Sequence, residues 1–173
     1  MAAYEIWNEP NLNYEWGYLA PDPAGYTALL KAAYGAVKEV DPEALVVSGG
    51  LATTGDGSPT ALGDLAFLQG MYDAGARGYF DALGSHPYAF GHEPDYVDPW
   101  GLSLSRVARQ REVMVTNGDA ERPIWITEAG WILHSSWNLG EHRTSAVNEA
   151  QQAEYLVRAY QKTRAEWPWV RAF

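Results

Sequence analysis

The chain has 173 residues, of which 47% are hydrophobic and 20% charged, and 12 basic against 22 acidic side chains give a formal net charge of −10. This composition predicts a single globular domain over residues 1–173 and excludes a disordered or collagen-like chain. The negative charge argues against nucleic acid as a partner, and the absence of cysteine excludes a disulfide framework, a thiolate metal site and a cysteine nucleophile.

Four short apolar segments, each followed by small or polar residues, are predicted as buried strands: Ala3–Trp7, Leu45–Ser48, Phe80–Ser85 and Ile124–Thr127. The stretch "WPWVRAF" at 167–173 is predicted to begin a fifth strand. No apolar run reaches about 18 residues, so we expect no membrane partner.

Helices are predicted between these strands. The first begins at Asp22-Pro23, a favourable N-cap and first-turn pair, and ends at Asp41-Pro42. Apolar residues at helical spacing predict two more helices, over 62–72 and over 104–117. A fourth begins at Asn148, which forms a capping pair with Gln151.

This alternation of strands and helices predicts an α/β fold with a parallel sheet and right-handed crossovers. Two architectures fit: a small doubly wound sheet, or part of a (β/α)8 barrel, which needs about 250 residues when complete. Length alone favours the doubly wound sheet. In both architectures the functional groups lie at the carboxyl ends of the strands.

The residues at the four strand ends include many side chains with functional groups that can bind or react. They are Asn8 and Glu9; Ser48, Gly49 and Gly50; Ser85, His86 and Tyr88; and Thr127, Glu128 and Trp131. Two carboxylates across a cleft, one protonated and one ionised, are what cleavage of a glycosidic bond requires. Indoles, including that of Trp7, add flat apolar faces that suit sugar rings.

Other interpretations of the same residues remain open. A single Glu at a strand end is more often a solvated surface group, but two of them among aromatic residues favour a site. His86, which precedes Pro87, could be a satisfied turn histidine. The remaining histidines lack the spacing of a zinc motif, so we expect no metal, and no glycine-rich phosphate turn follows the first strand, which disfavours a nucleotide-binding domain. We expect no cofactor.

Three motifs resemble those of retaining glycoside hydrolases of clan A. "YEIWNEPNL" at 4–12 resembles the fourth-strand motif of these enzymes, "SHPY" at 85–88 the sixth and "PIWITEAGW" at 123–131 the seventh. The resemblance is greatest to family 39 (β-xylosidase-like) and cellulase-like bacterial members, and it spans nearly the whole chain. It implies a partial (β/α)8 TIM barrel, about four βα units plus an incomplete fifth strand.

The resemblance also implies roles for individual residues. Glu9 would be the acid/base and Glu128 the nucleophile of a double displacement on a β-linked polysaccharide or oligosaccharide, with carboxyl groups about 5 to 5.5 Å apart. Asn8 would contact the 2-hydroxyl of the sugar. The remaining expected substrate contacts are His86, Tyr88, Trp131 and Trp7.

The chain departs from complete barrels because it matches only strands four to seven and the edge of the eighth. We expect the exposed sheet edges to be covered by a second copy in a homodimer, or by a missing N-terminal half of a longer enzyme, unless the sheet flattens into an open form. An alternative function is a non-catalytic carbohydrate-binding fragment. The sequence leaves a secreted and a cytoplasmic location equally open.

Overall fold

The structure is a computed structural model that describes residues 2–55 and 57–173. It is an α/β fold in which every strand pair is parallel, as the sequence predicts. The strands are β1 (Ala3–Ile6), β2 (Leu45–Ser48), β3 (Leu51–Ala52), β4 (Leu83–His86), β5 (Ile124–Ile126) and β6 (Val170–Ala172). The helices are α1 (Pro23–Val40), α2 (Asp64–Asp73), α3 (Arg106–Thr116), α4 (Glu149–Glu166) and the 3-10 helix η1 (Gly140–Ser145).

The four predicted strands and the fifth at the end of the chain are confirmed to within a few residues. One strand was missed: β3, which resumes the path of β2 after Gly49 and Gly50. β1 pairs with β2, and β3, β4, β5 and β6 pair in that order. A bridge between Val47 and Ala82 joins the two groups, so the strands form one continuous, curved row.

Gly50 is required where β2 passes into β3, because a Cβ atom there would overlap the ring of His86. The strand can therefore pass directly over the imidazole. This close approach brings the end of β1, which pairs with β2, near the end of β4.

The helix ends follow the predicted capping chemistry. The Asp22 side chain accepts a hydrogen bond from the backbone N–H of Ala24 at 3.0 Å, with Pro23 in the first turn of α1. Asn148 and Gln151 form the reciprocal capping box of α4. None of the helices in the described ranges is long and apolar enough to cross a bilayer.

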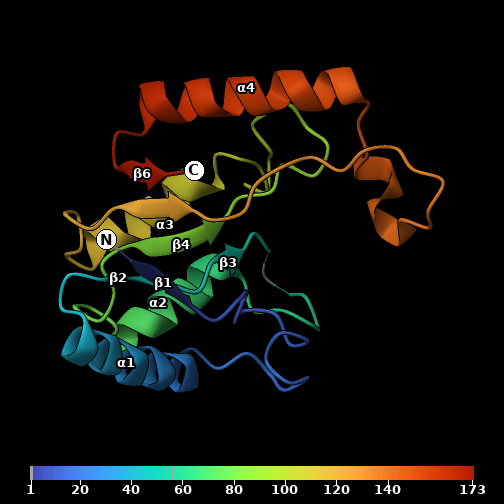
Figure 1. Ribbon diagram of the computed structural model, residues 1–173. Helices are drawn as coiled ribbons and strands as arrows, with labels where there is room; N and C mark the ends of the chain where they lie inside the picture. Colours follow the sequence, from blue (N-terminus) through green and yellow to red (C-terminus); the bar gives the residue numbers. More distant parts are fainter. Residues whose placement is uncertain (1, 56) are drawn as a thin grey trace.

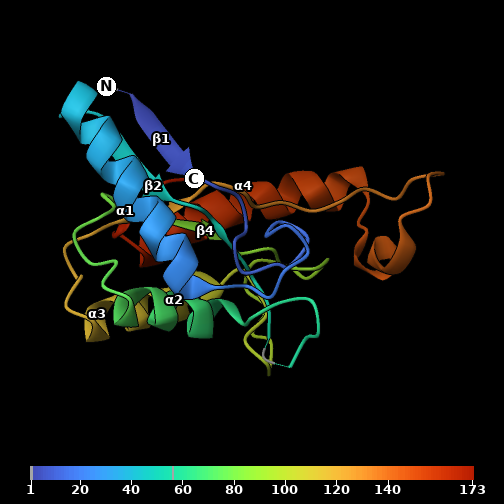
Figure 2. The same cartoon turned by 90° about the horizontal axis from the view of Figure 1, so that it is seen from below.

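Helix α1 lies beside the β1–β2 end of the row of strands and α4 lies beside β6 at the other end (Figure 1), and α2 and α3 lie side by side (Figure 2). The core fills the space between the helices and the strands, and its fully buried members include Tyr26, Leu30, Phe67, Met71, Phe80, Leu83, Met114 and Ile124. A buried network also crosses this layer. The Arg106 guanidinium donates to the Asp64 carboxylate at 2.7 Å, Gln110 donates to the same carboxylate at 2.8 Å, and the Ser85 hydroxyl of β4 donates to Gln110 at 2.6 Å.

The outermost strands, β1 and β6, each have one strand neighbour within the described residues. Ala3, Tyr4 and Glu5 of β1 are exposed, in contrast to the fully buried residues of β4. The fold is thus an open part of a barrel, with helices outside and an uncovered inner face.

Candidate active site

The turn after β1 presents Glu9 to the inner face. Trp7 (φ 74°) and Glu9 (φ 41°) both adopt left-handed backbone conformations, which are unfavourable for residues other than glycine. The turn is held by the buried Asn11, whose side chain donates to the carbonyl of Ala52 and accepts from its N–H, both at 3.0 Å. The backbone N–H of Glu9 also donates to the carbonyl of Gly50 at 3.1 Å.

β4 ends in His86, whose side chain is 1% exposed. Its Nδ1 atom lies 3.0 Å from Oε1 of Glu9 and 3.7 Å from Oε2 of Glu128. Its Nε2 atom lies 3.1 Å from the hydroxyl of Thr127. The structure therefore brings the predicted histidine between the two predicted carboxylates, at the end of β4 and not in a turn.

Glu128 follows β5 and interacts with Tyr88, which follows β4. The Tyr88 hydroxyl donates to Oε2 of Glu128 at 2.9 Å. Burial raises the pKa of Tyr88 well above its ordinary value, and the hydrogen bond to Glu128 and the charges of Glu128 and Glu9 raise it further. Tyr88 therefore remains a neutral phenol and a hydrogen-bond donor over the whole range in which enzymes work.

The two carboxylates face each other across a short gap. One carboxylate oxygen of Glu9, one of Glu128 and a ring nitrogen of His86 all lie within 4.8 Å of one another. Such donors also occur in metal sites, but here His86 and Glu128 already have the protein partners given above. We therefore do not assign them to a metal, and the expectation of no metal stays a prediction.

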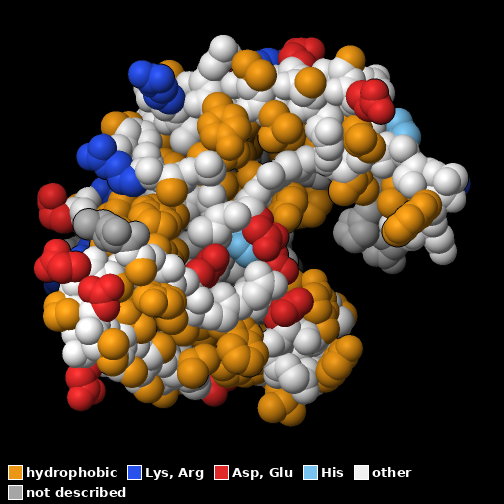
Figure 3. All heavy atoms as spheres, in the orientation of Figure 1, with side chains coloured by type: hydrophobic (Ala, Val, Ile, Leu, Met, Phe, Trp, Pro, Cys, Tyr) orange, Lys and Arg blue, Asp and Glu red, His pale blue; other side chains and the backbone are white. Residues whose placement is uncertain are grey.

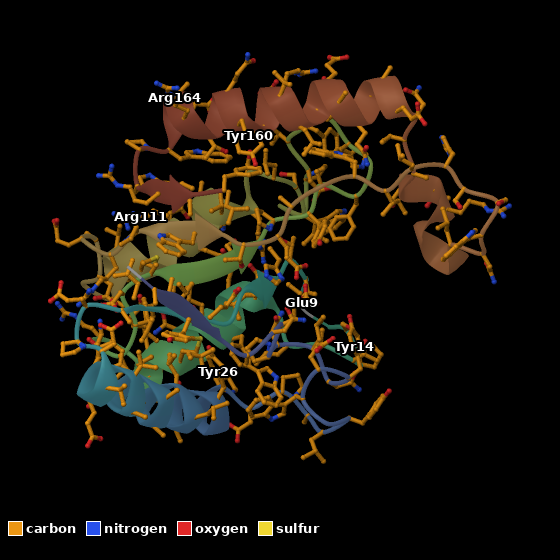
Figure 4. All side chains as sticks on the ribbon, viewed as in Figure 1. Glu9, Tyr14, Tyr26, Arg111, Tyr160 and Arg164 are labelled. Atoms are coloured by element: carbon orange, nitrogen blue, oxygen red, sulfur yellow. The ribbon has the colours of Figure 1, made fainter. Side chains whose placement is uncertain are left out.

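A cavity of about 370 Å³ adjoins Glu9 and has a mainly apolar wall that includes Tyr14, Phe90, Trp131 and Ile132. Figure 3 shows the hollow in the molecular surface, with acidic side chains and a histidine at its floor. In Figure 4, the Glu9 side chain lies on the open side of the molecule, and Tyr14 lies below it. Burial raises the pKa of Tyr14, with smaller contributions from the charges of Glu9 and Glu15.

The other predicted sugar contacts differ in how they meet the cavity. Trp131 lines it but is only 5% exposed, and its indole N–H donates to the carbonyl of His92 at 2.7 Å. Trp7 is half exposed and donates its indole N–H to the carbonyl of Glu15 at 3.0 Å. Asn8 is exposed on the same turn as Glu9. Contacts of all three with a sugar stay predictions.

We did not predict the roles of two residues of the site, Glu5 and Thr127, from the sequence. Glu5 lies on the inner face of β1, where its carboxylate accepts from the hydroxyl of Thr127 at 2.8 Å and from the backbone N–H of Gly50 at 2.9 Å. A charged residue inside an apolar strand was the available signal for Glu5. Thr127 was noted only as a strand-end residue, and its position next to His86 depends on the register of β4 and β5.

Two solved structures with similar folds are those of glycoside hydrolases. A GH128 (subgroup II) endo-β-1,3-glucanase from Sorangium cellulosum matches with a TM-score of 0.62 and 19% identity, over 99% of this chain and 57% of that chain. A family 51 α-L-arabinofuranosidase from Bifidobacterium longum matches with a TM-score of 0.52 and 17% identity, over 79% of this chain and 28% of that chain.

The chain thus spans about half the length of the first of these enzymes and less of the second. No protein-family model matches the sequence, and no curated protein matches it. At these identities the likeness is one of fold. The chain therefore has the fold of part of a (β/α)8 barrel, and the doubly wound alternative is set aside.

Proposed function

We propose that this chain carries the catalytic pair of a retaining glycoside hydrolase, with Glu9 as acid/base and Glu128 as nucleophile. The observation that carries the proposal is the approach of a Glu9 oxygen and a Glu128 oxygen to within 4.8 Å. Retaining enzymes hold their carboxyl groups about 5 to 5.5 Å apart, whereas inverting enzymes leave about 6.5 to 9.5 Å for a water molecule. The short gap supports direct attack by one of the carboxylates.

In the first step, protonated Glu9 gives its proton to the glycosidic oxygen as the bond from that oxygen to the anomeric carbon breaks. Ionised Glu128 forms the new bond to the same carbon. The leaving sugar departs as an alcohol and a glycosyl-enzyme ester remains. Tyr88 supports this role of Glu128, because its hydrogen bond fixes one oxygen and leaves the other free to attack.

In the second step, Glu9 is a carboxylate and takes a proton from a water molecule. The water oxygen bonds to the anomeric carbon, and the ester bond to Glu128 breaks. Both residues return to their starting states and the product keeps the configuration of the substrate. No cofactor is required.

The substrate we propose is a β-linked polysaccharide or its oligosaccharides. Asn8 would hold the 2-hydroxyl of the sugar, His86 would orient Glu9, and Trp131 and Trp7 would offer apolar faces. The placement among family 39-like or cellulase-like enzymes of clan A rests on the sequence motifs. Because a structural neighbour is described as an endo-β-1,3-glucanase, β-1,3-glucan oligosaccharides belong in the first substrate panel, beside aryl β-xylosides, β-glucosides and β-galactosides.

The test compares wild type with Glu128→Gln, Glu9→Gln and the matched control Glu39→Gln, which changes an exposed carboxylate on α1. On unactivated oligosaccharides we expect both cleft variants to lose at least about 100-fold in kcat/KM and the control to be unchanged. Azide should restore turnover of Glu128→Gly with inverted product and of Glu9→Gly with retained product. Wild-type rates in Glu128→Gln would refute the assignment.

The open inner face favours one second candidate, a carbohydrate-binding fragment without catalysis. Exposed residues of β1 and an uncovered cleft leave part of a sugar-binding wall unformed. Calorimetry that detects oligosaccharide binding, with no hydrolysis by wild type, would favour this alternative. We also propose that a second copy of the chain, or further barrel strands, cover the edges of the sheet at β1 and β6. Size-exclusion chromatography with light scattering tests for the homodimer.

A further inference from the structure

We infer that Glu5 and Thr127 are positioning residues that set how His86 and Glu9 share a proton, so that Glu9 enters the reaction as an acid. The inference rests on the proposed function for the role of Glu9. The contacts of Glu5, Thr127, His86 and Glu9 determine which of their atoms donate a hydrogen bond and which accept one.

The hydroxyl of Thr127 donates its hydrogen to Glu5. Oε1 of Glu5 accepts from this hydroxyl at 2.8 Å and from the backbone N–H of Gly50 at 2.9 Å. A carboxylate only accepts hydrogen bonds, and a threonine hydroxyl has a single hydrogen to donate. The hydrogen of Thr127 is therefore committed to Glu5.

The contact with Thr127 determines whether Nε2 of His86 carries a hydrogen. Nε2 lies 3.1 Å from the hydroxyl oxygen of Thr127. Because the only hydroxyl hydrogen points to Glu5, Thr127 can only accept in this contact. Nε2 must then carry a hydrogen. The ring is 1% exposed, so bulk water does not offer an alternative partner.

On the other side of the ring, Nδ1 lies 3.0 Å from Oε1 of Glu9. If the ring is neutral with its hydrogen on Nε2, Nδ1 is an acceptor and Glu9 must be protonated and donate to it. If the ring is an imidazolium, Nδ1 donates to an ionised Glu9. Both descriptions place one proton between Nδ1 and Glu9, and both exclude a bare Nδ1 facing a bare carboxylate.

The charges around the ring favour the same arrangement. Nδ1 lies 3.0 Å from Glu9 and 3.7 Å from Glu128, and Nε2 lies 4.0 Å from Glu5. Among the described residues, three phenols also lie near carboxylates of this cluster: Tyr88, Tyr14 and Tyr26. Within the described residues, no Lys or Arg forms an ion pair with any of the three carboxylates. A proton held between Nδ1 and Glu9 therefore reduces repulsion among three acidic groups.

This arrangement explains how one residue serves both steps. When Glu9 gives its proton to the leaving oxygen, its carboxylate is left facing the lone pair of Nδ1, which is unfavourable. Taking a proton from the attacking water removes that repulsion. The ring, held by Thr127 and Glu5, therefore supports Glu9 as an acid in the first step and as a base in the second.

The test uses Thr127→Val and Glu5→Gln, with Thr116→Val and Glu39→Gln as matched controls on the outer helices. The valine removes the acceptor for the Nε2 hydrogen. The glutamine can donate its amide hydrogen to Thr127 and so free the hydroxyl to donate to Nε2. Both changes favour a neutral ring with its hydrogen on Nδ1, beside an ionised Glu9.

Nitrogen-15 NMR of the imidazole, with the signal of His86 identified by its loss in His86→Asn, reports the proton positions without any substrate. We expect a hydrogen on Nε2 in wild type and in both controls, and its transfer to Nδ1 in the two test variants. A wild-type ring with its hydrogen on Nδ1 alone would overturn the inference, even if the variants failed to fold.

Kinetics supply the second readout. We expect Thr127→Val and Glu5→Gln to lower kcat/KM at least about tenfold on an unactivated oligosaccharide, and less than about threefold on a dinitrophenyl glycoside, whose leaving group needs no proton. The basic limb of the oligosaccharide pH profile should move to lower pH. Variants with the wild-type profile and an unmoved proton would overturn the inference. The expected NMR result without hydrolysis by wild type would refute the proposed function and support the proton arrangement.

Discussion

Replacing Tyr88 by Phe removes one hydroxyl and leaves the ring in the wall of the cleft. That hydroxyl donates to Oε2 of Glu128 at 2.9 Å, and a hydrogen bond to a charged group contributes about 1.5–3 kcal/mol. Because the Glu128 side chain is 46% exposed, water can replace part of this bond. We therefore expect a loss of about 1–2 kcal/mol, which is about 5- to 30-fold in kcat/KM.

The assay measures kcat/KM of wild type, Tyr88→Phe and the control Tyr79→Phe, whose ring packs against Tyr34 of α1. Burial and the hydrogen bond to Glu128 raise the pKa of Tyr88, so the phenol stays protonated and the ratio of wild type to Tyr88→Phe should be constant from about pH 5 to about pH 9. Full activity in Tyr88→Phe, with an unchanged melting temperature, would refute the role given to this contact.

Three further predictions address stability and metal dependence. Removing the fully buried carboxylate in Asp64→Ala leaves Arg106 and Gln110 without their acceptor, so the free energy of unfolding in urea should fall by about 3–5 kcal/mol, and a loss below about 1 kcal/mol would contradict this. The pKa of Asp95 is lowered chiefly by its hydrogen bond from Arg158, so its contribution is present above the unfolded-state pKa of about 4 and is lost as the pH falls through the lower folded-state value. Asp95→Asn should therefore destabilise slightly at pH 7, by less than about 1 kcal/mol because the pair is largely exposed, and the difference should shrink in thermal melts as the pH is lowered below the unfolded-state pKa. EDTA should leave hydrolysis unchanged, and a loss reversed by a divalent cation would contradict the prediction that no metal is required.

The order of the longer strands and helices could be predicted because most of these elements have a strong local signal. The Asp22-Pro23 start of α1 and the Asn148–Gln151 capping box of α4 are contained in a few adjacent residues, and the structure confirms both. β3 has no such signal, because two residues after a pair of glycines show no periodicity. It forms only because Leu51 and Ala52 pair with β4.

Part of the site could also be predicted, for a similar reason. Glu9 and Glu128 stand at strand ends, and a parallel sheet brings such ends to one edge. The roles of Glu5 and Thr127 could not be predicted, because they depend on contacts between β1, β4 and β5 across 122 positions of sequence. Only the sheet register decides which hydroxyl meets His86.

The left-handed backbone at Glu9 limits how this protein can be engineered. A residue with φ of 41° costs about 1–3 kcal/mol unless it is glycine or, to a lesser degree, asparagine. A library screened for heat resistance alone should therefore enrich glycine or asparagine at position 9. Such variants would tolerate higher temperatures and lack the proposed acid, so selection at this position has to include turnover from the first round.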